Sequence, residues 1–142
     1  ALLHSAVAGV GPEEDKTVHI CCGYPSEVDL DNFPKAPASA YFDLARMLDE
    51  SVVDCVSIED AHRYNDLSLL ERFSSTTVIL GVAQIAATRV EGVEEIRARL
   101  ESALRHVDGE RLRAGPDCGL AMLDWETVGA KLRNLCAVAH SL

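Results

Sequence analysis

Four side chains that could bind a metal lie at or just after the ends of predicted β-strands. His19 and Cys21 belong to the first predicted strand, Glu59 follows the second, and Cys118 follows the fourth. Functional groups of parallel α/β folds collect at the carboxyl ends of the strands. Residues two positions apart on a strand point to the same side, so His19 and Cys21 should face together.

An imidazole, two thiolates and a carboxylate form a donor set that suits a borderline-soft ion such as zinc. Glu59 would complete a tetrahedron begun by His19, Cys21 and Cys118, and the occupied site would carry a net charge of about −1. Each residue also has an ordinary structural interpretation, as a core histidine, a buried thiol or a solvated carboxylate. Their coincidence at one edge of the predicted sheet favours the metal site.

Three neighbouring residues are further candidates. Asp117 could orient a metal ligand by hydrogen bonding or could cap its loop, and both interpretations stay open. His62, three residues after Glu59, is either a surface loop histidine or a weak candidate for substrate contact and proton transfer. Cys22 should point away from Cys21, into the helix layer or the turn, and its role stays open.

The remaining cysteines and Trp125 are interpreted as packing residues. Cys55 and Cys136 lie in apolar stretches and are expected to be buried. The chain has five cysteines, and this odd number argues against a fold held together by disulfide bonds. Trp125 is expected to pack at the start of the last helix.

Extended and helical patterns alternate along the chain. The predicted strands are Thr17–Cys22, Val52–Ile58, Thr77–Val82 and Arg111–Gly115. Helical spacing of apolar residues predicts helices that begin after a cap at Ser39, after a cap at Asp66, near Val93 and near Trp125. Residues 1–9 resemble the tail of a helix, which suggests that the chain is a piece of something longer.

Strict strand–helix alternation predicts a parallel sheet covered by helices. Four such units fit a small doubly wound sheet or half of a (β/α)8 barrel. No glycine-rich phosphate motif follows a predicted strand, which disfavours nucleotide binding. The strand-end site favours the barrel. We therefore predict an α/β fold of the (β/α)8 TIM-barrel type, with residues 1–142 as a single half-barrel domain and residues 1–10 as the end of a preceding helix.

Composition excludes several classes of protein. The chain is 48% hydrophobic and 25% charged, as globular domains are. The net charge of −10 argues against a nucleic-acid surface, which needs clustered Lys and Arg. No apolar run approaches the roughly 20 residues needed to span a bilayer. We expect a cytoplasmic protein with neither nucleic-acid nor membrane partners.

Several short motifs together resemble the C-terminal barrel of cobalamin-independent methionine synthase. They run in the family's order from about Thr17 to the end of the chain, and the His-x-Cys and Asp-Cys-Gly-Leu elements are the most specific. The motifs are Val18–Cys21, Val56–Glu59, Ile79–Val82, Val90–Glu91, Pro116–Leu120 and Lys131–Asn134.

The resemblance implies that His19, Cys21, Glu59 and Cys118 bind a catalytic zinc. Zinc would hold a substrate thiol as its thiolate near neutral pH, ready to attack an electrophilic carbon. In the family the thiol is homocysteine, which takes the methyl group of a methyltetrahydrofolate. Glu59 is the ligand expected to leave when the substrate sulfur arrives.

The chain also departs from the family. The folate-using enzymes have a histidine where this chain has Gln84–Thr88, and the longer stretch between His19 and Glu59 resembles the short archaeal-type and coenzyme M-alkylating relatives. Another small thiol or alkyl donor is therefore an alternative. The chain lacks an N-terminal half-barrel, so we expect it to pair with one or to self-associate. A non-catalytic half-barrel that serves as a binding or assembly module is the third hypothesis.

Overall fold

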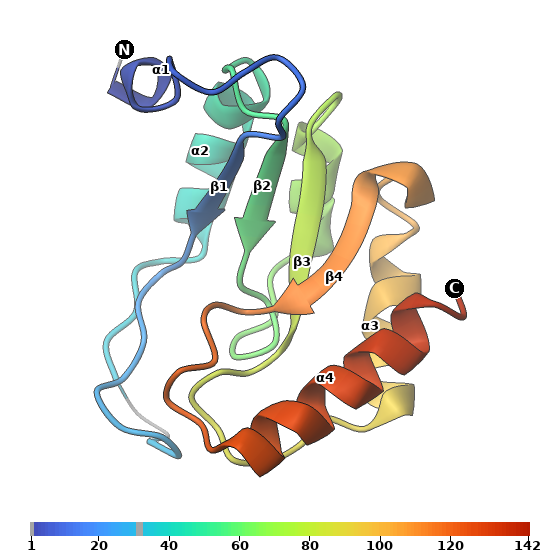
Figure 1. Cartoon of the computed structure of the whole chain (residues 1–142). Helices are drawn as coiled ribbons and strands as arrows, with labels where there is room; N and C mark the ends of the chain where they lie inside the picture. The colour runs from blue at the N-terminus through green and yellow to red at the C-terminus, as the bar shows by residue number, and fades with distance from the viewer. Residues whose placement is uncertain (1, 31–32) are drawn as a thin grey trace.

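Four parallel strands form a single sheet in a computed structural model that describes residues 2–30 and 33–142 (Figure 1). The strands are β1 (Thr17–Ile20), β2 (Cys55–Ile58), β3 (Thr77–Ala83) and β4 (Leu112–Pro116), and they lie in the order β1-β2-β3-β4. A doubly wound sheet reverses its strand order at a switch point, whereas a barrel adds each strand beside the previous one. The consecutive order confirms the half-barrel of four βα units.

A helical segment follows each strand. The helical elements are α1 (Leu2–Ala6), α2 (Ser39–Asp49), the 3-10 helix η1 (Leu67–Arg72), α3 (Val93–Ala103), the 3-10 helix η2 (Gly109–Arg111) and α4 (Trp125–Ala139). Among the described residues, none of these helices is long and apolar enough to cross a bilayer.

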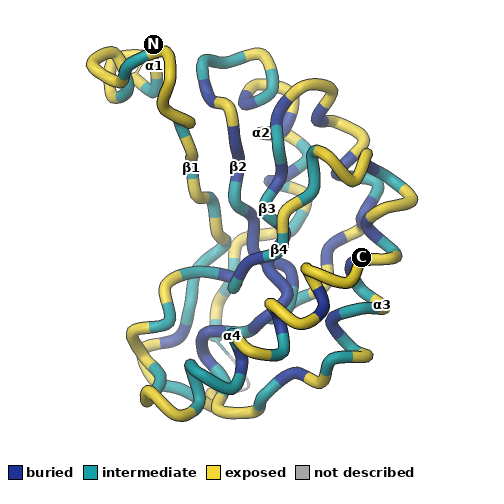
Figure 2. The backbone as a smooth tube through the Cα atoms, turned by 45° about the vertical axis from the view of Figure 1, so that its right-hand side comes forward, coloured by how far each residue is buried: buried dark blue, intermediate teal, exposed yellow. Residues whose placement is uncertain are grey.

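The hydrophobic core lies between the helices and one face of the sheet. Val56, Val78 and Leu80 are fully buried in one apolar cluster with Ile96 and Leu100 of α3. Figure 2 shows this buried centre as a dark-blue band along the middle strands. Burial of the predicted apolar stripe of α3 stabilises the helix against the sheet.

The opposite face of the sheet is largely uncovered. His19, Ser57, Ile79 and Arg113 pair across the four strands and therefore share a face. His19 and Arg113 are exposed, and the other two are half-buried. In a complete barrel this face would point to the interior.

Local capping follows one prediction and contradicts another. The carboxylate of Asp66 accepts a hydrogen bond from the Ser68 amide at 3.0 Å and caps η1 as predicted. The prediction of a Ser39 cap is wrong, because Ser39 is the first residue of α2 and the preceding Ala38 offers no side-chain acceptor.

Two boundary predictions and two packing predictions are wrong. β1 ends at Ile20, so Cys21 and Cys22 lie in the following loop, and β2 begins only at Cys55.

Cys55 is buried as predicted. Cys136 is exposed because the inward face of α4 is formed by Lys131, Leu135 and Val138, which recur at helical spacing. Trp125 is 90% exposed in the first turn of α4.

Candidate functional site

Glu59 is a buried carboxylate at the carboxyl end of β2. It is 1% exposed, and both of its oxygens have partners. Oε1 accepts a hydrogen bond from the Cys22 amide at 3.0 Å, and Oε2 accepts one from Lys35 Nζ at 2.8 Å. Burial opposes ionisation, but the hydrogen bonds from Lys35 and Cys22 outweigh it and hold the pKa of Glu59 below its usual range. Glu59 is therefore a charged carboxylate that an internal cation neutralises.

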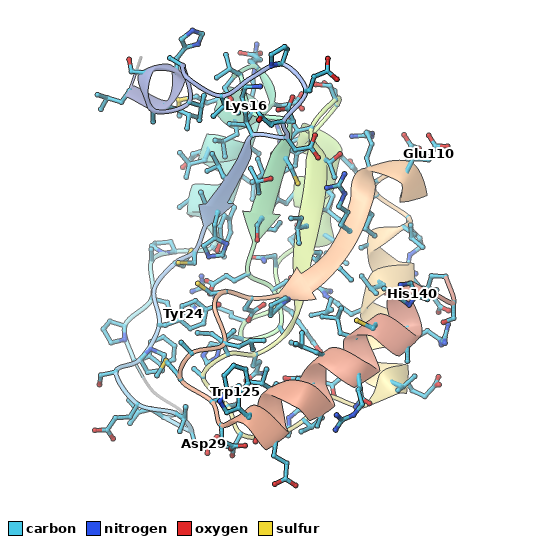
Figure 3. The ribbon with its side chains drawn as sticks, in the orientation of Figure 1. Lys16, Tyr24, Asp29, Glu110, Trp125 and His140 are labelled. Carbon is cyan, nitrogen blue, oxygen red and sulfur yellow. The ribbon has the colours of Figure 1, made fainter. Side chains whose placement is uncertain are left out.

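Lys35 comes from the loop between β1 and α2, which turns back to the strand ends (Figure 1). Its ammonium also donates to the Gly23 carbonyl at 3.0 Å and lies 4.8 Å from the ring centroid of Tyr24 and 5.3 Å from that of Phe33. Figure 3 shows Tyr24 at the carboxyl-end side of the sheet, opposite Lys16. Carbonyl and aromatic faces are both favourable neighbours for an ammonium group.

The other three predicted zinc ligands lie near the carboxyl ends of β1 and β4. His19 lies on β1 with Nδ1 3.1 Å from Ser57 Oγ, and Cys21 is exposed just beyond the strand. Cys118 is half-buried, two residues after the end of β4. Cys22 packs against the hydrophobic core, in agreement with the prediction that it points away from Cys21.

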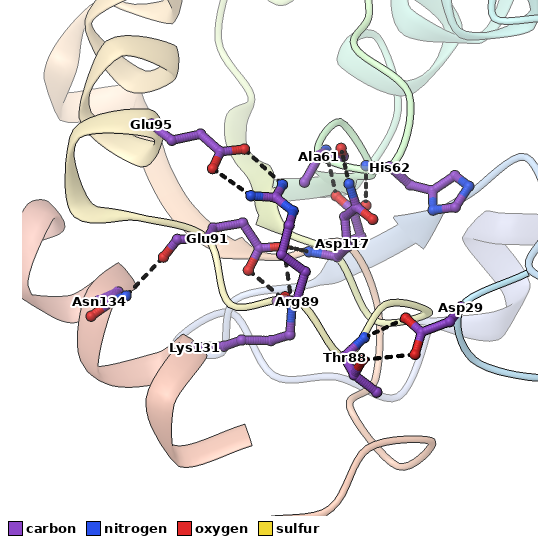
Figure 4. A network of polar contacts seen from close by, with 11 residues as sticks. Asp29, Ala61, His62, Thr88, Arg89, Glu91, Glu95, Asp117, Lys131 and Asn134 are labelled. Carbon is purple, nitrogen blue, oxygen red and sulfur yellow. Dashed lines mark hydrogen bonds and ion pairs between the residues drawn. The ribbon is translucent and has the colours of Figure 1, made fainter. Parts of the chain in front are cut away.

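Asp117 links the end of β4 to the segment that follows Glu59. It is fully buried, and its carboxylate accepts hydrogen bonds from the amides of Asp60, Ala61 and His62 at 2.8, 2.9 and 2.8 Å. Figure 4 shows Asp117 beside Ala61 and His62. Burial raises the pKa of Asp117 to about 6, against these hydrogen bonds. A Cβ atom on Gly81 would lie 2.2 Å from Asp117 Oδ1, so this approach requires glycine.

The same segment is held against α3 by a second buried carboxylate. Asp60 accepts hydrogen bonds from Arg99 Nε at 2.5 Å and Nη2 at 2.7 Å, and from the Asn65 amide at 2.8 Å. A two-point guanidinium–carboxylate contact fixes orientation as well as distance. The backbone on either side of Glu59 is thus held by β2 and by Asp60 and Asp117.

A third polar network holds the loop between β3 and α3. Lys131 Nζ donates to the Glu91 carboxylate at 2.9 and 3.1 Å and to the Arg89 carbonyl, and the Gln84 amide donates to Glu91 Oε1 at 3.0 Å. Lys131 is completely buried. Figure 4 shows these contacts bridging α4 and the loop.

His62 packs against aromatic rings. Its ring centroid lies 4.9 Å from that of Phe33 and 6.2 Å from that of Tyr24. Nδ1 is buried without a hydrogen-bond partner, and burial lowers the pKa of the imidazole. His62 is therefore a neutral imidazole, and it packs on the same aromatic rings as Lys35. A role for His62 in substrate contact stays a prediction.

His19, Cys21, Glu59 and Cys118 are residue types that suit zinc. In this structure, however, their side chains are not arranged around a common point. Across residues 2–30 and 33–142, no cluster of three or more His, Cys, Asp or Glu side chains is arranged to hold a metal. Glu59 is engaged by Lys35, while the buried hydroxyls of Tyr24 and Tyr41 lack hydrogen-bond partners. A buried polar group without a partner calls for an explanation, and a bound water or ion is one that applies here.

Sequence reasoning missed the lysine and arginine partners of the buried carboxylates. Lys131 carried a usable signal, since it shares the helical spacing of Leu135 and Val138 on the buried face of α4. Lys35 carried none, because it lies 24 residues from Glu59 in an irregular loop.

Comparison with known proteins identifies one family. The family described as "Cobalamin-independent synthase, Catalytic domain" matches residues 38–141, a range that includes Glu59 and Cys118 and begins after His19 and Cys21. The chain is 33% identical to a methionine synthase of Thermococcus kodakarensis over 98 residues, which are 68% of this chain and 29% of that protein. It is 27% identical over 139 residues to a 5-methyltetrahydropteroyltriglutamate–homocysteine methyltransferase of Streptomyces griseus, covering 96% of this chain and 16% of that protein.

A solved structure extends the similarity to nearly the whole chain. It is a B12-independent methionine synthase from Shewanella sp. W3-18-1 in complex with selenomethionine, with a TM-score of 0.75 and 27% identity. The match covers 94% of this chain and 40% of that protein. The chain thus spans well under half the length of the relatives that it matches.

Proposed function

Since the chain belongs to the cobalamin-independent methionine synthase family, we propose that it forms the metal-binding half of a barrel that transfers a methyl group to a thiol. The observation that carries this proposal is the hydrogen-bonded link between the segments that follow β2 and β4. Asp117, beside Cys118, holds the amides that follow Glu59, so the two candidate ligands lie on segments that are fixed to each other. Homocysteine as acceptor and a methyltetrahydropteroyl compound as donor agree with the names of the relatives.

His19, Cys21, Glu59 and Cys118 would hold a zinc ion. When bound, zinc would supply Lewis acidity that lowers the pKa of a substrate thiol. The two thiolates and the imidazole match its preference for soft and intermediate donors. Glu59 is the oxygen donor of the set and the one expected to give way to a substrate sulfur.

The chain's own residues would position and shelter this site. Asp117 holds the segment after Glu59 through three amides, and Asp60 ties that segment to Arg99 of α3. The neutral imidazole of His62 lies among aromatic rings, where it could contact the substrate. Such fixed surroundings keep ligands oriented before the substrate arrives.

An N-terminal half-barrel is the partner that the sheet would accept. Among the described strands, β1 pairs only with β2 and β4 only with β3, so each has a free edge. Free edges of parallel strands are normally covered. Pairing with an N-terminal half, or with a second copy of the chain, would cover them and enclose the open face that carries His19. We place the assembled protein in the cytoplasm.

A second candidate function keeps the zinc and changes the reactants. The segment Gln84–Thr88 has no histidine, and Gln84 Nε2 donates to the Ala61 carbonyl at 3.0 Å. No imidazole in this segment could give a proton to a folate. Alkylation of another small thiol, or use of another alkyl donor, would avoid that requirement.

Zinc analysis tests the proposal directly. We expect about one zinc per chain in protein purified without chelator. Cys118→Ser should lose it, whereas Cys136→Ser, which changes an exposed cysteine on α4, should retain it. Zinc-free protein, or equal zinc in both variants, would contradict the proposed site. Methyl transfer to homocysteine, measured after addition of the N-terminal half, then separates the two candidate functions.

A further inference from the structure

We propose that Lys35 is a built-in counter-ion for Glu59, and that its ion pair and a bound metal exclude each other. This inference rests on the proposed zinc site. Zinc would have to displace the Lys35 ammonium from Glu59 before this carboxylate could bind the metal.

The Lys35 ammonium occupies a complete cation site. It is 8% exposed and faces the 2%-exposed side chain of Glu59 at 2.8 Å. The Gly23 carbonyl and the rings of Tyr24 and Phe33 surround its other sides. A buried carboxylate without a counter-charge is strongly disfavoured, so a cation must remain beside Glu59 while it is buried.

Zinc and the ammonium would compete for the same oxygen. Cys22 holds Glu59 Oε1, which leaves Oε2 as the atom that faces Lys35. A zinc ion binds a carboxylate oxygen at about 2.0–2.2 Å. An ammonium group at its present distance from Oε2 would then lie close to a divalent cation, and their repulsion would be weakly screened in a buried site.

The Lys35 side chain can leave Glu59 while the loop between β1 and α2 stays attached to the rest of the protein. Asp29 accepts hydrogen bonds from the Thr88 amide and hydroxyl at 2.8 and 2.7 Å, and Arg63 donates to the Ala36 carbonyl at 2.9 Å. These contacts lie on both sides of Lys35 in the chain. The flexible four-carbon stem lets the ammonium move to solvent while the flanking backbone stays in place.

The lysine composition makes a direct test possible. Lys16, Lys35 and Lys131 are the lysines of this chain. Amine labelling followed by mass spectrometry should show Lys35 protected in the metal-free chain and several-fold more reactive after zinc addition. Lys16, at the opposite end of the sheet, and the fully buried Lys131 should not change.

Zinc affinity gives an independent measurement. Competition with a chromophoric chelator should show that Lys35→Gln binds zinc about 10- to 100-fold more tightly, because no ammonium has to be displaced from a charged hydrogen bond. Lys16→Gln is the matched control, since it removes a lysine from the surface pair with Asp54, and it should change affinity less than about twofold.

The outcomes separate this inference from the proposed function. Zinc binding by the original chain with unchanged Lys35 labelling and equal affinity in Lys35→Gln would overturn the inference and leave the zinc site intact. Weaker binding by Lys35→Gln would also overturn it, since Lys35 would then support the metal. Failure of the original chain and of Lys35→Gln to bind zinc would overturn both proposals.

Discussion

Replacing Lys131 with methionine should lower the free energy of unfolding more than most single substitutions in this chain. Methionine fills the space of the lysine stem, so little cavity is created. The loss comes from Glu91, which is 2% exposed and would keep only the Gln84 amide as a donor to its carboxylate. The Arg89 carbonyl would lose a donor as well.

Breaking a buried ion pair by removing one partner costs about 3–5 kcal/mol. That is a large share of the roughly 5–15 kcal/mol that stabilises a typical domain. The double variant Lys131→Met with Glu91→Met removes the isolated charge and leaves an unpaired amide at Gln84, which costs about 1–3 kcal/mol. The two substitutions should therefore be strongly non-additive, with a coupling energy of about 2 kcal/mol or more.

Urea unfolding followed by far-ultraviolet circular dichroism measures all four members of this cycle. The two single variants, Lys131→Met and Glu91→Met, complete the cycle. The original chain should be the most stable, and the double variant should be more stable than Lys131→Met. A loss below about 1 kcal/mol in Lys131→Met, or a double variant as unstable as the sum of the single changes, would refute the reasoning that Glu91 depends on this lysine.

Three further substitutions test other parts of the structure by the same unfolding measurement. Gly81→Ala should cost about 3 kcal/mol, the upper end of the usual cost of overpacking, because the new Cβ would lie 2.2 Å from Asp117 Oδ1. A loss below about 1 kcal/mol would show that the end of β4 shifts freely. For Asp49, burial is outweighed by hydrogen bonds from Ser74, Ser75 and Thr76, so the pKa is lowered on folding. Its contribution is complete above the ordinary aspartate pKa of about 3.9 and disappears as the pH falls. Asp49→Asn should therefore cost about 1 kcal/mol near neutral pH and less in acid, and a difference that grew in acid would contradict this sign. Trp125→Ala should change stability by less than about 0.5 kcal/mol, because the side chain is 90% exposed, and a loss above 1 kcal/mol would reveal packing that the structure does not contain.

The fold followed from the sequence because its central elements carry strong and unambiguous patterns. β3 is apolar along most of its length, and Ile96 and Leu100 recur at helical spacing in α3. The ends of elements were harder to predict. Val52 to Asp54 are compatible with an extended strand, but they lie before the first pairing of β2 with β1, at Cys55. Strand ends depend on where a partner is available, which local sequence does not determine.

The candidate site was predictable only in part. Glu59 and Cys118 could be placed because residues at strand ends meet at one edge of a parallel sheet. The contact between Lys35 and Glu59 depends on the path of an irregular loop, for which no periodic pattern exists. Whether all four predicted ligands meet around one ion remains a prediction for the zinc measurement.

The consecutive strand order has a consequence for how the chain folds. Each strand pairs with the one before it, so every new pairing closes a loop of only about 20 to 40 residues. No late strand has to insert between two earlier ones. During synthesis from the N-terminus, each βα unit can therefore dock on the edge left by the previous unit. The unit that docks last, β4 with α4, is the one that brings Cys118 to the strand ends, so the candidate site is completed only when the sheet is.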